Sequence, residues 1–246
     1  MCNFFSLVSD GKGKIFYFDW TLREKCIKKE LNFEPDSHTS IATHFGFDGK
    51  KEDSLNKYEY NPLTKVFTVD QINTKDDRKN VEEQCHSLDF KLIVPQLIIK
   101  PIIHPFKDVP EVNKVTQKDI ALLKQWVSVW ASVRYSVGVS VGVSVGDSVV
   151  ASVWYSVGDS VRASVVASVW ASVGDSVRAS VGDSVRAYAG SFVTLEKWEY
   201  IKHKKGEYPY QPLVELWERG LVPSFDGNVW RLHTGKDAKI IYEWKK

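Results

Sequence analysis

The residues whose types could support covalent chemistry stand near the start of the chain, where Cys2 is followed by Asp36 and His38. Removal of Met1 would leave Cys2 with both a thiol and a free α-amine, so one residue could serve as nucleophile and base. Asp36 or His38 would then orient it. This set supports the hypothesis of an N-terminal-cysteine hydrolase or transferase. The structural alternative makes Cys2 a small buried strand residue and Asp36 a helix cap.

A second set of suggestive residues lies near the C-terminal end of the sequence. A catalytic interpretation would place His233 beside Asp226, with Ser224 as the nucleophile. No nucleophile elbow or oxyanion motif surrounds Ser224, and Asp226-Gly227 is a common turn sequence. The sequence therefore favours a packed turn or a small binding surface at this place.

The opening Met-Cys resembles that of N-terminal-nucleophile amidohydrolases and of DNA–protein crosslinking domains, a resemblance that covers two residues. Three longer stretches, MCNFFS, DSHTSIATHFGF and NKYEYNPLTKVFTVDQ, are similar to uncharacterised proteins of bacteriophages and of mobile elements in gut bacteria. This similarity covers roughly residues 1–110 and implies an accessory protein of a phage or mobile element. It brings no activity with it.

The composition limits the classes of ligand that we expect. The three cysteines are widely spaced without a CxxC motif, and His44, His86 and His104 are isolated at any ligand spacing, so neither a metal nor a cofactor is expected. The formal net charge of +2 gives no nucleic-acid footprint. The most apolar segment, 92–106, is too short and too interrupted to span a membrane. Together with the missing signal peptide, these features predict a cytoplasmic protein with reduced thiols.

The elements that would position any site are organised around a repeat of four residues. Over the 60 residues 128–187, Ser stands at every fourth position and Val always follows it. The third position varies among Gly, Arg, Trp and Val, and the fourth among Ala, Asp, Tyr and Val. Residues 150–165 and 166–181 differ only at Tyr155 and Ala171, so a second period of sixteen residues lies over the first.

The four-residue period favours extended backbone over helix. An α-helix turns 100° per residue, so each tetrad overshoots a full turn by 40° and the Val row keeps no lasting face. The six Gly, with the many Ser and Val, cost roughly 20 kcal/mol of helix propensity relative to Ala. In a strand, each tetrad repeats the same pattern, with Val and the fourth residue inside and Ser and the third residue outside.

The predicted fold class is therefore mixed, with a central β-solenoid of tetrapeptide repeats and about 16 residues per coil. The stretch resembles pentapeptide-repeat solenoids, from which its four-residue period departs. A helical repeat region and a poorly ordered insert remain as alternatives. We expect an N-terminal α+β domain over 1–115, a capping helix over 116–127, the solenoid with its C-terminal cap over 128–193 and a small α+β domain over 194–246.

Trp and Arg, the types enriched at interface hot spots, occupy third positions of the repeat, which a solenoid would turn outward. The candidate binding residues are Trp130, Arg134, Trp154, Arg162, Trp170 and Arg178. The alternative is that Trp shields the Val core. This pattern predicts a non-enzymatic binding or scaffolding protein with a protein partner, in which the solenoid is a rigid spacer and could join copies through its edge or outer face. A Ser array that binds ice or glycan is disfavoured, because Arg and Trp interrupt any flat ladder.

Overall fold

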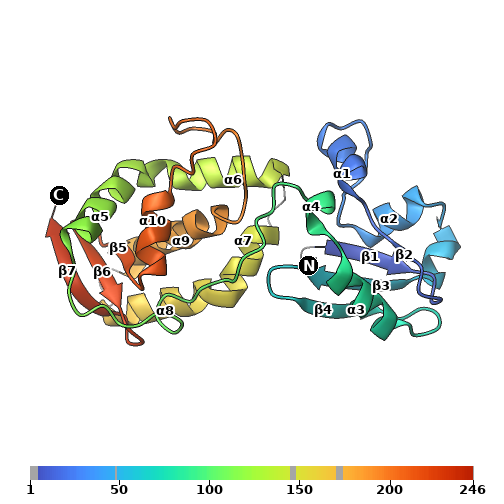
Figure 1. The fold of residues 1–246 in the computed structure, drawn as a ribbon, viewed down its shortest axis with the longest axis horizontal. Helices are drawn as coiled ribbons and strands as arrows, with labels where there is room; N and C mark the ends of the chain where they lie inside the picture. The colour runs from blue at the N-terminus through green and yellow to red at the C-terminus, as the bar shows by residue number, and fades with distance from the viewer. Residues whose placement is uncertain (1–4, 48, 145–147, 170–173, 246) are drawn as a thin grey trace. The chain divides into compact units, whose positions relative to one another are not determined.

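The computed structural model describes residues 5–47, 49–144, 148–169 and 174–245 (Figure 1). The chain forms two compact units, Met1–Ile99 and Lys100–Lys246. The segments 116–127, 128–193 and 194–246 that the sequence suggested as separate parts all lie inside the second unit. The Cys2 of the proposed N-terminal nucleophile lies outside the described residues.

The first unit contains a four-stranded antiparallel sheet with the order β2-β1-β3-β4. Its strands are β1 (Phe5–Ser9), β2 (Ile15–Phe16), β3 (Asn56–Asn61) and β4 (Val66–Gln71). Its helices are α1 (Trp20–Ile27), α2 (His38–His44), the 3-10 helix η1 (Gly49–Ser54), α3 (Arg78–Ser87) and α4 (Phe90–Ile93). Short turns join β1 to β2 and β3 to β4, so the sheet contains two hairpins.

Side-chain caps begin α1 and α2 of this unit. The side chain of Ser37, and not that of the neighbouring Asp36, accepts a hydrogen bond from the backbone N–H of Ser40 at 3.3 Å at the start of α2. At α1, Asp19 accepts from the N–H of Leu22 at 3.0 Å. The helix therefore begins at Trp20.

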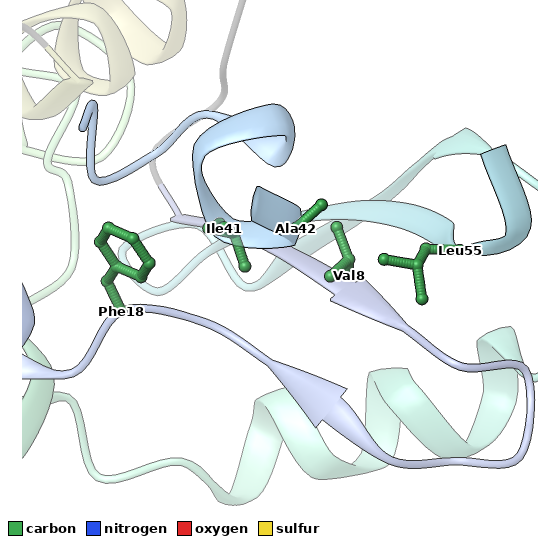
Figure 2. Close-up of a cluster of buried hydrophobic side chains, with 5 residues drawn as sticks. All are labelled: Val8, Phe18, Ile41, Ala42 and Leu55. Atoms are coloured by element: carbon green, nitrogen blue, oxygen red, sulfur yellow. The ribbon is translucent and has the colours of Figure 1, made fainter. Parts of the chain in front are cut away.

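A cluster of buried apolar side chains fixes α2 against the sheet (Figure 2). Val8 of β1, Phe18, Ile41 and Ala42 of α2, and Leu55 are all at most 1% exposed. Burying each large side chain contributes about 1.5–3 kcal/mol. This packing sets the position of the α2 N-terminus, which carries His38.

The predicted β-solenoid is wrong, because the described part of the repeat is helical. Its elements are the end of α5 (Gln117–Val129), the 3-10 turn η2 (Trp130–Ser132), α6 (Val133–Ser144), α7 (Ser148–Val153), the π-helical turn η3 (Trp154–Gly158), α8 (Asp159–Ser168) and α9 (Gly174–Gly190). The segment 188–193, expected to cap the solenoid, continues α9 to Gly190.

Most of the described Val residues that follow Ser in the repeat are nevertheless buried, as the four-residue period predicted. Val153, Val161, Val165, Val177 and Val181 are each 0% exposed. The burial of such side chains along the repeat is together of the same order as the roughly 20 kcal/mol of helix propensity that Gly, Ser and Val cost. Tertiary packing therefore outweighs propensity here, as it does for most helices in proteins.

The 40° overshoot per tetrad does not accumulate, because each helix spans few tetrads. The four α-helices α6, α7, α8 and α9 have 12, 6, 10 and 17 residues. Between α7 and α8, the π-helical turn η3 has i→i+5 hydrogen bonds and turns less per residue, so a tetrad there falls short of a full turn. In α9, Val185 is followed by the equally buried Tyr188 and Ala189, three and four residues on, so the buried face widens at the end of the repeat.

The remaining elements of the second unit surround α9. Helix α10 (Gln211–Glu218) precedes a three-stranded antiparallel sheet of β5 (Val222–Phe225), β6 (Val229–Thr234) and β7 (Lys239–Lys245) in the order β5-β6-β7. Helix α9 packs against α6, α7, α8, α10 and β5 (Figure 1). A capping box of Thr116 and Asp119 begins α5, within the helix expected over 116–127. The repeat thus supplies α9 to the core of this unit, while other repeat residues remain on its surface.

Candidate functional site

The structure gives Asp36 and His38 separate partners. The carboxylate of Asp36 forms a two-pronged ion pair with Arg23, at 2.6 and 3.0 Å, and accepts from the N–H of Ser6 at 3.3 Å. His38 Nε2 lies 3.0 Å from the carbonyl oxygen of Tyr58, to which it can donate, and its Nδ1 lies 3.5 Å from the carboxylate of Asp70. Asp36 therefore anchors the buried Arg23, and neither side chain orients the other.

We expect Asp36→Ala to destabilise the first unit by about 3 kcal/mol, because it leaves the guanidinium of Arg23 buried without its partner. Arg23 is 7% exposed, so solvent cannot replace the carboxylate fully. Amide hydrogen exchange of the strands β1 and β3 measures the change in the stability of this unit. His38→Ala is the matched control and should cost about 1 kcal/mol, the value of one ordinary hydrogen bond. Equal losses in the two variants would contradict the assigned role of Asp36.

Of the C-terminal set, the structure brings Ser224 and His233 together and leaves Asp226 apart. The hydroxyl of Ser224 lies 2.8 Å from His233 Nε2. His233 Nδ1 lies 2.9 Å from the carbonyl oxygen of Ala238, so the proton on Nδ1 is donated there and Nε2 accepts from Ser224. Asp226 instead pairs with Arg231.

Burial excludes this Ser–His pair from acting on a substrate in the described structure. Ser224 and His233 are both 0% exposed. Burial also lowers the pKa of His233 to about 4, so the imidazole is neutral at physiological pH. The arrangement joins β5 to β6, so the two residues are packed as one of the sequence alternatives expected, although they lie in strands and not in a turn.

The Ser row of the repeat makes contacts inside the second unit, where the strand interpretation had turned it outward. Ser160 Oγ lies 2.5 Å from His104 Nε2, and Ser168 Oγ lies 3.1 Å from His233 Nδ1. Ser180 Oγ accepts from the N–H of Phe225 at 2.9 Å. Ser132 and Ser140 make similar bonds to Tyr210 and to the N–H of Glu199. The serines therefore attach the non-repeat segments to the repeat helices.

The candidate binding residues that the structure describes divide into three groups. Trp130 has its ring edge-on to Trp230 and Phe225, at 5.2 and 5.7 Å between centroids, and so joins the helices to the sheet. Arg134, Trp154 and Arg162 belong to one surface cluster. Arg178 is exposed and makes no ion pair or ring contact within the described part of the chain. Trp170 lies outside the described residues.

The surface cluster is centred on Trp154 in the π-helical turn. The guanidinium carbons of Arg162 and Arg186 lie 5.3 and 5.9 Å from the centroid of its ring, within cation–π range. Arg186 donates to Asp183 at 3.0 Å, and Arg134 lies 3.7 Å from the same carboxylate. We refer to Arg134, Trp154, Arg162 and Arg186 as the Trp154 cluster.

Two features of the repeat hold Trp154 in place. Its indole N–H donates to Asp159 at 3.0 Å, and Asp159 also accepts from Arg162 at 3.1 Å. Gly158 leaves room for the ring, since a Cβ there would lie 3.1 Å from both Trp154 Cδ2 and Val185 Cγ1. The Gly158-Asp159 pair of the repeat thus supports the tryptophan on a helix.

The positively charged side chains of the cluster are exposed to solvent, whereas the carboxylate of Asp183 is buried. The side chain of Asp183 is 8% exposed, and burial raises its pKa while Arg134 and Arg186 oppose that rise. The side chains of Arg134, Arg162 and Arg186 are 59%, 41% and 36% exposed. Arg186 was not among the site residues predicted from the sequence. In a helix it lies four residues after Gly182, so the two residues share one face.

Other kinds of site find no support among the described residues. None of the described His, Cys, Asp and Glu side chains form a group that could hold a metal ion. No helix in the described ranges is long and apolar enough to cross a membrane. Hollows of about 370 and 350 Å³ lie on the first unit along Asp76–Asn80 and beside Gln84, and none of the candidate residues line them.

Comparisons with known proteins add no relative. No family model, no curated protein and no solved structure matches this chain. The function must therefore be argued from the geometry of the site.

Proposed function

We propose that this chain is a binding protein that recognises a partner protein through the Trp154 cluster. The observation that carries the proposal is the partly buried Trp154 with guanidinium groups of Arg162 and Arg186 against it. Tryptophan and arginine are the types most enriched among residues that dominate binding energy. Here they come from segments far apart in sequence and meet at one place on the second unit.

Preorganisation of the cluster supports the same function. Trp154 is held by its bond to Asp159 and by contact with Gly158, and Arg186 is held by Asp183. Side chains fixed before association lose less conformational entropy on binding, about 0.5–1.5 kcal/mol less for each one. The helical repeat thus has the role of a frame for a contact surface. A rigid solenoid spacer and the joining of copies through a solenoid edge both require strands, whereas the described part of the repeat is helical.

The alternative of a Cys2 hydrolase or transferase has no comparable support. Asp36 is occupied by Arg23 and His38 by the carbonyl of Tyr58. We further propose that the protein acts in the cytoplasm, because Cys26 and Cys85 are free thiols and burial raises the pKa of Cys85 to about 12, which keeps it protonated.

Affinity capture with three baits tests the proposed function. We expect a partner that wild type and Arg178→Ala retain and that Trp154→Ala loses. Arg178 is the matched control, because it occupies the tetrad position of Arg162 sixteen residues later and lies outside the cluster. Thermal unfolding of each bait checks that the second unit remains folded. Recovery of the same proteins by wild type and Trp154→Ala would contradict the proposal.

A further inference from the structure

The guanidinium groups of the Trp154 cluster retain most of their hydrogen-bond donors. An arginine side chain has five N–H donors. In the described part of the chain, Arg162 donates once to Asp159 and Arg186 once to Asp183. Arg134 lies 3.7 Å from Asp183, which is beyond hydrogen-bond distance. The three side chains are partly exposed, so these donors are available to a ligand.

The charge of the cluster leaves one positive charge without a partner. Arg134, Arg162 and Arg186 contribute three positive charges, and Asp159 and Asp183 contribute two negative charges, so the sum is +1. Of the two carboxylates, Asp183 is almost fully buried beneath the arginines. A ligand with one negative charge restores neutrality at this place.

The guanidinium groups beside Trp154 favour a planar anion as their ligand. A guanidinium that lies against an indole ring keeps its N–H edge free, and that edge matches a carboxylate with two parallel hydrogen bonds. The guanidinium carbons of Arg162 and Arg186 lie within cation–π distance of the Trp154 ring, and each side chain donates one hydrogen bond to an Asp, so further N–H donors of both remain for such an anion. A nucleic-acid backbone presents a series of phosphates and needs a stripe of unpaired basic residues, whereas this cluster has one spare positive charge.

Resting on the proposed function, we propose that the partner presents an acidic segment, with an Asp or Glu carboxylate bound by Arg162 and Arg186 and the neighbouring chain over Trp154. The carboxylate accepts N–H bonds from both guanidinium groups, and the apolar stem of the same residue contacts the indole. The recognised chemistry is thus a carboxylate on a peptide, held at the junction of η3, α8 and α9.

Selection from a random peptide library on the full-length protein tests this inference. We expect the peptides that bind wild type to be enriched in Asp and Glu and to lose binding to Trp154→Ala. Their affinity for Arg162→Ala should fall by about 10- to 100-fold, the effect of losing a hydrogen bond to a charged group. Arg162→Lys keeps the charge and loses the planar edge, so its affinity should also fall. Arg178→Ala should bind as wild type does.

The outcomes separate the inference from the proposed function. Neutral or basic peptides that depend on Trp154 would overturn the acidic segment and leave the binding function in place. A failure to select any peptide that depends on Trp154 would count against both. Titration with oligothymidylate and with inorganic phosphate forms the second arm. Tighter binding of either probe than of the acidic peptides, lost in Arg162→Ala, would replace the carboxylate by a phosphate ligand and overturn the inference.

Discussion

Val181→Asp is expected to unfold the second unit, whereas the same replacement at Val139 should leave it folded. Both residues belong to the repeat. Val181 is 0% exposed in α9, and Val139 is 42% exposed in α6. An unpaired carboxylate at Val181 would have no solvent and no partner, and such burial costs more than about 4 kcal/mol. That loss is a large share of the 5–15 kcal/mol by which domains are stable.

The two variants also separate helix from strand. In extended backbone, Val139 is two residues from Val137 and would share its buried face. In the helix, the same two side chains point in different directions, and Val137 is 1% exposed. Circular dichroism and guanidinium unfolding of Val181→Asp, Val139→Asp and wild type measure the difference. A collapse of Val139→Asp as severe as that of Val181→Asp would contradict the helical packing.

The second large effect is a loss of stability on acidification, caused by two buried histidines. The pKa of His233 is lowered to about 4 by burial, and burial likewise lowers the pKa of His104. Since an unfolded histidine has a pKa of about 6.5, the unfolded state takes up these protons first. The stabilisation is therefore complete above about pH 6.5 and is lost as the pH falls toward 4. For His233 alone the loss is on the order of 3 kcal/mol.

Other titrating groups with shifted pKa values do not account for a loss of stability between about pH 6.5 and pH 4. The lowered pKa values of Asp226 and Asp77 place their contributions below about pH 4. The raised pKa of Asp183 acts in the opposite direction, because its protonation on acidification favours the folded state.

Urea unfolding at intervals between pH 7 and pH 4.5 measures the effect of the histidines. In His233→Gln most of the pH dependence should disappear, because glutamine does not titrate. A stability of the wild type that is independent of pH over this range would contradict the neutral, buried His233.

Local signals in the sequence predicted local structure well. The helix expected over 116–127 begins at a capping box of Thr116 and Asp119, which are three residues apart in sequence. The packed interpretation of Ser224 was also correct, although its partner His233 lies nine residues away on the neighbouring strand.

The prediction of a β-solenoid was wrong because the argument against helix assumed one uninterrupted helix over the whole repeat. The repeat is divided into short helices, and the π-helical turn η3 compensates part of the overshoot. None of these corrections is visible in the tetrad itself. The inward bonds of Ser160 and Ser168 depend on His104 and His233, which lie far away in the sequence.

The sequence predicted some members of the candidate site and missed others, because long-range packing decides which residues meet. Trp and Arg were identified by type, and Arg134, Trp154 and Arg162 meet in one cluster. The internal role of Trp130 and the contribution of Arg186 required knowledge of which helices pack together. Residue type thus indicated the chemistry, and only the tertiary structure showed which residues share a surface.

Backbone NMR of the full-length protein tests the helical repeat most directly. Successive amide protons lie close together in a helix and far apart in a strand, whereas the α-proton of one residue lies close to the next amide in a strand. Over residues 148–168 and 174–190 we predict continuous amide–amide contacts and helical carbon shifts. Strong α-proton to amide contacts across those residues, with contacts between neighbouring coils sixteen residues apart, would contradict the account and with it the surface on which the Trp154 cluster depends.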